Sequence, residues 1–125
     1  MGAIAFSPDG TRIAFFSDEA IKAMPVQGGP AEILVHEIKH GRHSELAFSP
    51  SGDRIAFTTG RPYEGEAKIW VAQLSTGLST ELQTGLPADA MYHGFSWSPD
   101  VEKIAFVAYT GGKNEFWLMS DFLPE

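Results

Sequence analysis

The chain has 125 residues, 43% of them hydrophobic, and it carries a formal net charge of −7 and no cysteine. Length and hydrophobic content suit one compact folded domain, and the acidic balance argues against nonspecific nucleic-acid binding, which needs a basic surface. The lack of cysteine excludes disulfide scaffolds, thiolate zinc sites and cysteine nucleophiles, and it leaves both reducing and oxidising compartments open.

One pattern occurs three times along the chain. A Phe or Trp followed by Ser-Pro leads, five residues after the Ser, to a basic residue and then to Ile-Ala-Phe; the copies are residues 6–15, 48–57 and 97–106. The serines recur after 42 and then 49 positions. Periods of about 40 to 50 residues that are rich in strand signals are typical of β-propeller blades.

Each repeat predicts a sheet of short strands in a fixed order. A first strand of alternating apolar residues is followed by a tight turn at Ser-Pro and by the Ile-Ala-Phe strand, which we expect to be buried between sheets. Third strands are expected at 21–26, 69–74 and 116–119, and fourth strands at 32–35 and 80–83. The third repeat has no room for a fourth strand, so we expect eleven strands. No window shows a 3.6-residue apolar period, so we expect no helix.

Two positions depart from the common pattern. Val101 stands where the first two turns have a Gly, so the third turn should differ in type or carry an extra residue. In the first repeat, Lys22 and Pro25 stand where the second has Trp70 and Gln73. Because proline has no backbone donor, the strand holding Pro25 should be weakly paired or bulged.

These residues resemble the WD-like propeller repeat of TolB-type proteins, whose unit runs Trp/Phe-Ser-Pro-Asp-Gly, a basic residue, Ile-Ala-Phe, a loop, Ile-Trp/Tyr-Val, a Gly turn and an outer strand. The resemblance covers almost the whole chain. It implies an all-β fold of three four-stranded antiparallel propeller blades, the last lacking its outer strand, which is half of a six-bladed β-propeller. Residues 1–125 would form a partial propeller, with blades at about 1–41, 42–90 and 91–125.

The number of blades raises the question of ring closure. A propeller normally needs roughly four to eight blades, so three cannot close alone, and their outer surfaces would expose apolar residues. The chain is part of a longer propeller that supplies the remaining blades, or two copies pair into a six-bladed ring, or the three blades stay an open monomer.

The connections between strands place the candidate site. In a propeller, the loops that join the fourth strand to the next blade, and the second strand to the third, emerge together near the mouth of the central channel; we call this side the loop face. On this acidic chain, the loop face concentrates titratable and aromatic side chains that suit an acidic peptide, a carboxylate or a partner protein. The candidate binding residues are His40, Arg42, His43, Arg61, Tyr63, Tyr92, His93 and Lys113.

Catalytic and metal-binding patterns are weak. His36, Glu37 and His40 match the His-Glu-x-x-His string of zinc proteases, but that chemistry needs the string on a helix, and here it follows an expected outer strand. The repeated Ser-Pro motifs are interpreted as structural turns, and the nucleophile pattern Gly-x-Ser-x-Gly is absent. We therefore expect no enzyme activity, no metal and no cofactor.

The resemblance leaves two functions open, because the same repeat serves in Tol-Pal envelope proteins, in propellers that cap serine peptidases and in sensor proteins. The first is a noncatalytic module that binds protein or peptide. The alternative is the propeller portion of a serine peptidase, controlling substrate access to a catalytic domain outside this sequence. Neither nucleic acid nor membrane insertion is expected. The compartment is open: extracytoplasmic if an upstream signal was removed, otherwise cytoplasmic.

Overall fold

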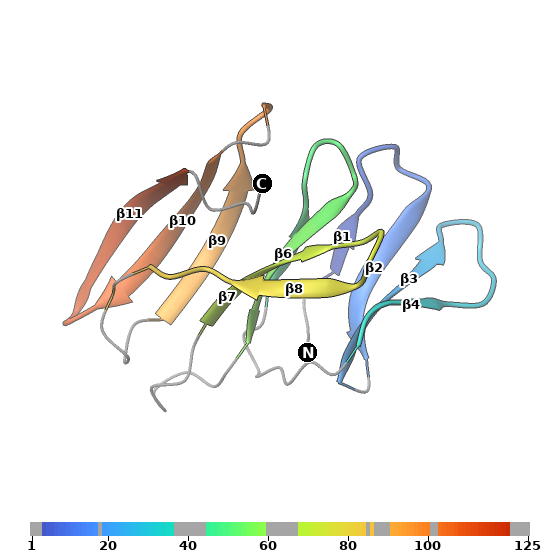
Figure 1. The fold of residues 1–125 in the computed structure, drawn as a ribbon, viewed down its shortest axis with the longest axis horizontal. Coiled ribbons are helices and arrows are strands. Elements are labelled where there is room, and N and C mark those ends of the chain that lie inside the picture. The colour runs from blue at the N-terminus through green and yellow to red at the C-terminus, as the bar shows by residue number, and fades with distance from the viewer. Residues whose placement is uncertain are drawn as a thin grey trace.

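The computed structural model of this chain describes residues 4–17, 19–36, 45–59, 68–84, 86, 91–100 and 103–120. Within these residues it contains eleven strands and no helix, as the sequence predicts. The strands form three antiparallel sheets that lie side by side, which we call blades 1, 2 and 3 in chain order (Figure 1). The described part of the chain contains no helix long and apolar enough to span a membrane.

Each blade is built from consecutive strands, so every strand pairs with its neighbour in sequence. Blade 1 contains β1 (Ile4–Phe6), β2 (Arg12–Ser17), β3 (Ala20–Pro25) and β4 (Glu32–Val35). Blade 2 contains β5 (Leu46–Phe48), β6 (Arg54–Thr59), β7 (Lys68–Gln73) and β8 (Leu78–Glu81). Blade 3 contains β9 (Met91–Trp97), β10 (Lys103–Thr110) and β11 (Lys113–Ser120). The expected all-β propeller architecture, with three strands in the last blade, is confirmed within the described residues.

The three blades share one strand register. The Ile of each Ile-Ala-Phe strand lies opposite an aromatic residue of the first strand, in the pairs Phe6–Ile13, Phe48–Ile55 and Trp97–Ile104. The Phe lies opposite the third strand, in the pairs Phe15–Lys22, Phe57–Trp70 and Phe106–Trp117. Positions in the three blades can therefore be compared one to one.

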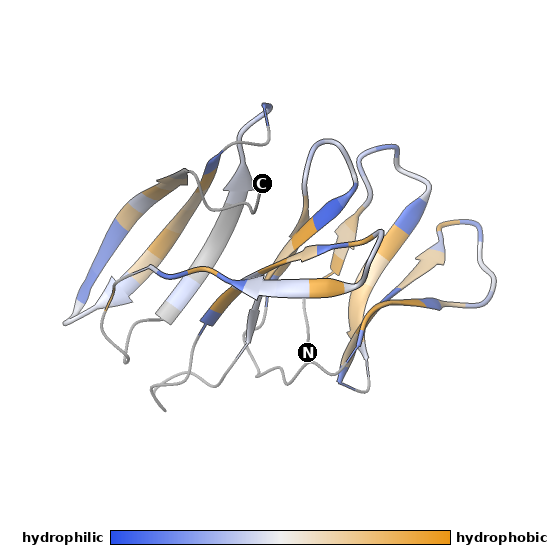
Figure 2. Cartoon of the chain, in the orientation of Figure 1, coloured by the Kyte–Doolittle hydropathy of each residue, from blue (hydrophilic) through white to orange (hydrophobic). Residues whose placement is uncertain are grey.

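Each blade has two surfaces, because successive side chains of a strand point to opposite sides. We call the surface that bears the Ile and Phe of Ile-Ala-Phe the Ile surface, and the opposite one the Ala surface. Two apolar clusters join the blades. Their members lie on the strands, where Figure 2 shows most of the hydrophobic residues. The first combines Ala14, Ile21, Ala23 and Val35 of blade 1 with Leu46, Ile55, Phe57 and Ala72 of blade 2. The second combines Ala56, Ile69, Val71 and Leu82 of blade 2 with Ile104, Phe106 and Ala108 of blade 3.

The first strands of successive blades lie next to one another, with β1 against β5 and β5 against β9. A polar contact crosses the second of these boundaries. The indole Nε1 of Trp97 in β9 donates a hydrogen bond to the backbone oxygen of Ala47 in β5, at 3.2 Å. Blades 2 and 3 are thus joined by a hydrogen bond as well as by apolar packing.

Two expectations need correction. Ile55, Phe57, Ile104 and Phe106 are buried as predicted, but Ile13 and Phe15 are only half-buried. The reason is that they lie on the Ile surface of blade 1, which faces away from blade 2.

The strand that holds Pro25 is irregular as expected, but not at Pro25 itself. Pro25 is the last residue of β3, which keeps full register with β2, and a proline at a strand end costs little pairing. The irregularity in this blade lies instead between Ile21 and Lys22, where the register against β4 shifts.

Candidate functional site

The blades present two ends with different chemistry. The turn between the first and second strands of each blade lies at one end, which we call the turn face, and the hairpin turn between β10 and β11 lies at the other (Figure 1). The loop face, at this second end, includes the start of β9 and the ends of β6 and β10.

The turn face repeats one hydrogen-bonded motif in all three blades. The hydroxyl of the recurring serine accepts a hydrogen bond from the backbone nitrogen five residues on, at 3.0 to 3.2 Å. The same hydroxyl donates to an aspartate: Ser7 to Asp9, Ser49 to Asp53 and Ser98 to Asp100. The expectation that these serines are structural turn residues is therefore supported by where their hydrogen bonds go.

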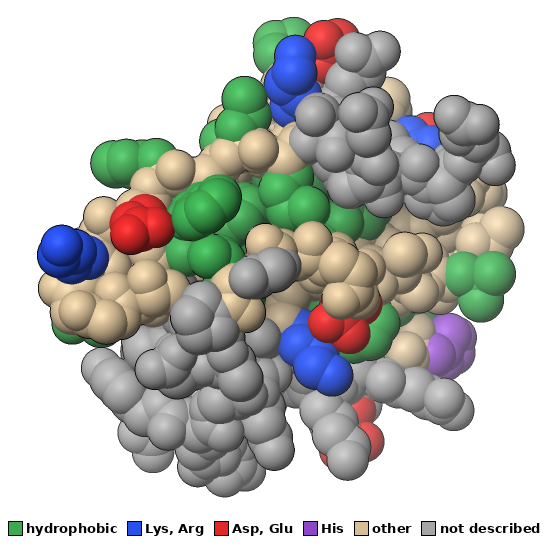
Figure 3. Space-filling model, turned by 60° about the vertical axis from the view of Figure 1, so that its left-hand side comes forward, with side chains coloured by type: hydrophobic (Ala, Val, Ile, Leu, Met, Phe, Trp, Pro, Cys, Tyr) green, Lys and Arg blue, Asp and Glu red, His purple; other side chains and the backbone are tan. Residues whose placement is uncertain are grey.

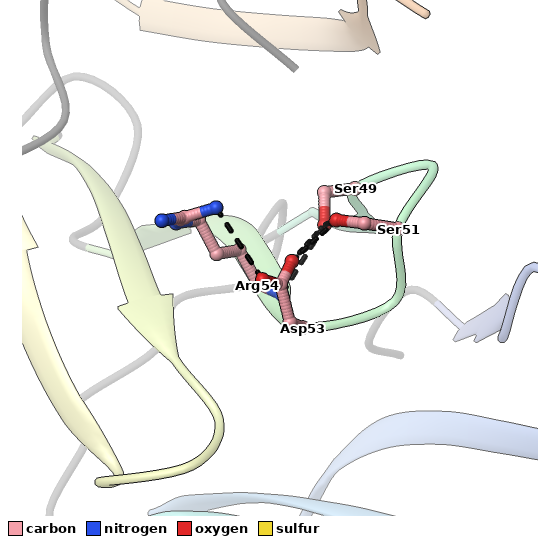
Figure 4. Close-up of polar contacts among 4 residues, drawn as sticks. All are labelled: Ser49, Ser51, Asp53 and Arg54. Carbon is pink, nitrogen blue, oxygen red and sulfur yellow. Dashed lines mark hydrogen bonds and ion pairs between the residues drawn. The ribbon is translucent and has the colours of Figure 1, made fainter. Parts of the chain in front are cut away.

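The turns of blades 1 and 2 carry a carboxylate and a hydroxyl at swapped positions. In blade 1 Asp9 accepts from Ser7 and Thr11, whereas in blade 2 Ser51 stands at the aspartate position and Asp53 at the threonine position. Figure 4 shows Ser49 and Ser51 directed at Asp53, with Arg54 on its other oxygen. Gly10 and Gly52 close these two turns with positive φ values of 74° and 79°, which glycine adopts without strain.

These hydrogen bonds stabilise the ionised carboxylates. The Ser7 hydroxyl, followed by the backbone and hydroxyl of Thr11, lowers the pKa of Asp9 to about 2. The Ser51 hydroxyl is the main cause that lowers the pKa of Asp53. Both side chains are thus anionic acceptors committed to their own turns.

The third turn is closed by the same backbone hydrogen bond as the other two. The backbone nitrogen of Ser98 donates to the oxygen of Lys103 at 2.9 Å, as Ser7 does to Arg12 and Ser49 to Arg54. Val101, on which the expected difference depends, lies outside the described residues.

Tyr92 is the best-defined of the candidate binding residues on the loop face. Its hydroxyl shares a hydrogen bond with the Thr84 hydroxyl at 2.9 Å, and its half-buried ring meets Phe106 edge to face with centroids 5.7 Å apart. The Thr84 hydroxyl also accepts from the backbone nitrogen of Leu86 at 3.2 Å. The hydrogen bond between Tyr92 and Thr84 therefore ties the start of the connection from β8 to β9 back onto β9, and it holds the partly exposed ring of Tyr92 in one position.

Blade 2 contributes a second aromatic group near the same end. Trp70 stacks on Phe57 with centroids 6.5 Å apart, and its Nε1 donates to the Thr59 hydroxyl at 2.8 Å. Lys68 and Glu81 form an ion pair of 3.8 Å beside it. The sequence pattern did not single out these residues as site residues; the alternation of Trp70 with buried Ile69 and Val71 was the available signal.

The remaining candidate residues are placed only in part. Lys113, the first residue of β11, is exposed. His93 lies in β9, where its backbone pairs with Val107 of β10, and nothing is described of its side chain. Five further candidates lie outside them altogether: His40, Arg42, His43, Arg61 and Tyr63. The convergence of all eight residues on the loop face stays a prediction.

The zinc-protease string is also placed only in part. His36 follows β4 as an exposed residue, and Glu37 and His40 lie outside the described residues. Among the residues that are described, no three His, Asp or Glu side chains are grouped to hold a metal ion.

Three antiparallel sheets packed Ala surface to Ile surface define a segment of a β-propeller. Solved propeller structures share this arrangement at low sequence identity. TolB from Acinetobacter baumannii matches 95% of this chain with a TM-score of 0.74 and 23% identity. Dipeptidyl peptidase 4 from Porphyromonas gingivalis matches 94% with a TM-score of 0.70 and 10% identity. The β-propeller domain of the Trilobed protease from Pyrococcus furiosus matches 94% with a TM-score of 0.62 and 21% identity.

The chain spans 29%, 23% and 38% of these three proteins, respectively. No protein-family model matches the sequence, and no curated protein matches it. The TolB-like propeller fold that the repeats predict is confirmed, and the similarities establish the fold alone.

Proposed function

We propose that this chain is a noncatalytic module of the TolB-like, WD-type propeller repeat family that binds a protein or peptide at its loop face. The observation that carries this proposal is that the polar side chains of the turn face are used within their own turns, whereas the loop face presents aromatic and charged side chains. At the turn face the recurring serines and aspartates are committed to their own hairpins. The inner blade surfaces pack against one another, so of the two ends the loop face is the one left for recognition.

The chemistry of the loop face suits an acidic peptide. Tyr92 offers an aromatic ring whose position is already fixed by Thr84 and Phe106, and a preorganised ring loses little entropy on binding. Exposed Lys113 provides a positive charge on the same face, and the candidates Arg42 and Arg61 would add planar guanidinium groups that bind carboxylates in pairs.

The second candidate function is the propeller portion of a serine peptidase. Two of the similar structures, dipeptidyl peptidase 4 and the propeller domain of the Trilobed protease, come from peptidases. An α/β-hydrolase sequence adjoining these repeats in one polypeptide would favour this function, whereas its absence from the full gene would favour the free binding module.

Nuclear magnetic resonance titration with short peptides tests the proposed function. An acidic peptide containing an aromatic residue should shift the backbone amides of Tyr92 and Lys113 and leave those of Asp9 and Asp53 in place. A double Arg42→Ala, Arg61→Ala variant should weaken binding at least tenfold, and the turn-face control Arg54→Ala should not. Shifts confined to the turn face, or no saturable shift with acidic or basic peptides, would contradict the proposal.

A further inference from the structure

The two blade boundaries inside the chain are of one type. At each, the Ala surface of one blade packs against the Ile surface of the next. This leaves two surfaces without a neighbouring blade in the structure: the Ile surface of blade 1 and the Ala surface of blade 3. One is an Ile surface and the other is an Ala surface. If they met, they would form the same kind of contact that joins blade 1 to blade 2 and blade 2 to blade 3.

Both outer surfaces are apolar and open. On blade 1, Ile4 is 65% exposed and Phe6 is 62% exposed, whereas Leu46, which occupies the register position of Ile4 in blade 2, is buried. On blade 3, Phe116 is 86% exposed and Leu118 is 64% exposed. The residues at the register position of Phe116 in blades 1 and 2 are Ile21 and Ile69, and both are fully buried.

We infer that these surfaces are a self-association site, in which the Ala surface of blade 3 packs against the Ile surface of blade 1 of a second copy of this chain. Two copies arranged head to tail make two such contacts and bring six blades together, within the range of roughly four to eight that closes a propeller ring. Self-association deepens the proposed function, because it sets two loop faces around one channel, but its test does not depend on peptide binding.

The register argues for head-to-tail contact rather than contact between identical surfaces. Facing two Ile surfaces would place Phe6 and Phe15 against their own copies, a combination that neither internal boundary uses. Facing Phe116 and Leu118 against Ile4 and Phe6 repeats the packing of Ile21 and Ala23 with Leu46 and Phe48 in the first cluster. Contact between unlike surfaces forms a ring when its rotation closes.

The surroundings of the patches are compatible with this contact. With the blade 3 side turned toward the viewer, hydrophobic side chains gather near the middle of the surface, with separate charged side chains beside and below them (Figure 3). Lys22 lies on the Ile surface of blade 1 at the position of Trp70 and Trp117. A lysine there can cover apolar neighbours with its aliphatic stem while its ammonium group stays in water.

Light scattering coupled to size-exclusion chromatography tests the inference directly. The chain at micromolar concentration should have twice its 13.6 kDa mass. Phe116→Asp and Ile4→Asp should each give monomers that keep the β-sheet circular dichroism signal, because both residues are exposed within the chain. Leu78→Asp, at a 71% exposed position on β8 of the middle blade, is the matched control and should remain dimeric.

Mixing the two monomeric variants distinguishes the geometry of the contact. Phe116→Asp retains an intact blade 1 surface, and Ile4→Asp retains an intact blade 3 surface, so the mixture should form a heterodimer through one intact contact. If Phe116→Asp or Ile4→Asp fails to fold, Leu118→Asp and Ile33→Asp test the same two surfaces. A monomeric wild-type chain, a Phe116→Asp variant that stays dimeric, or a series of masses growing with concentration would overturn the closed two-copy ring.

Discussion

The recurring serine illustrates how one residue specifies a turn. Ser49 is fully buried, and its hydroxyl accepts from the Arg54 nitrogen and donates toward Asp53, so its bonding capacity is used within five residues. A buried hydroxyl without a hydrogen-bond partner would lower the stability of the fold by about 1–3 kcal/mol. The aspartate in each of the three turns accepts from the serine hydroxyl and so avoids this loss. These bonds commit the serine hydroxyl to turn formation rather than to nucleophilic chemistry.

The Asp9 carboxylate should titrate at about 2 in the folded chain, compared with about 4 in an unfolded chain. Because the folded pKa is the lower one, ionised Asp9 stabilises the fold above about pH 4, and this contribution disappears as the pH falls toward 2. A carbon-detected nuclear magnetic resonance titration measures it. Ser7→Ala should raise the pKa of Asp9 and Ser49→Ala should not; a wild-type midpoint near pH 4 would contradict the hydrogen-bonded turn.

Strands and loops differ in what the sequence alone reveals. The Ile-Ala-Phe strands and their turns follow from local spacing, because their pairing partners lie only a few residues away. Burial of the same strands depends on neighbouring blades, which is why Ile55 is buried and Ile13 is only half-buried. On the loop face, the bond from Tyr92 to Thr84 depends on how a whole connection folds back, and local patterns carry no signal for that.

Replacement of Phe57 by Ala should destabilise the chain by about 3–5 kcal/mol. Phe57 is buried, stacks on Trp70 and meets Phe16 edge to face with centroids 6.5 Å apart, so its removal leaves a cavity between blades 1 and 2. Phe15→Ala removes the same side chain at the same register position, where it is half-buried, and should cost less. Urea unfolding in the Phe116→Asp background measures both without self-association, and equal costs would contradict the assignment of the two blade surfaces.

At the scale of the whole molecule, blade 2 has both surfaces packed, whereas blades 1 and 3 each have one. Stability against local opening should follow this order, because amide exchange is slowest where strands are covered on both sides. In the monomeric Phe116→Asp variant, the amides of β6 should therefore exchange more slowly than those of β2 and β10.

In the wild-type chain, a closed ring covers the outer surfaces as well, so β2 and β10 should gain protection relative to β6. Hydrogen exchange read by mass spectrometry on both chains separates two properties: the gradient in the variant reports how blades stabilise their neighbours, and its reduction in the wild type reports that other copies supply the missing contacts. A uniform pattern in the monomeric variant would mean that packing on one surface is enough to protect a blade.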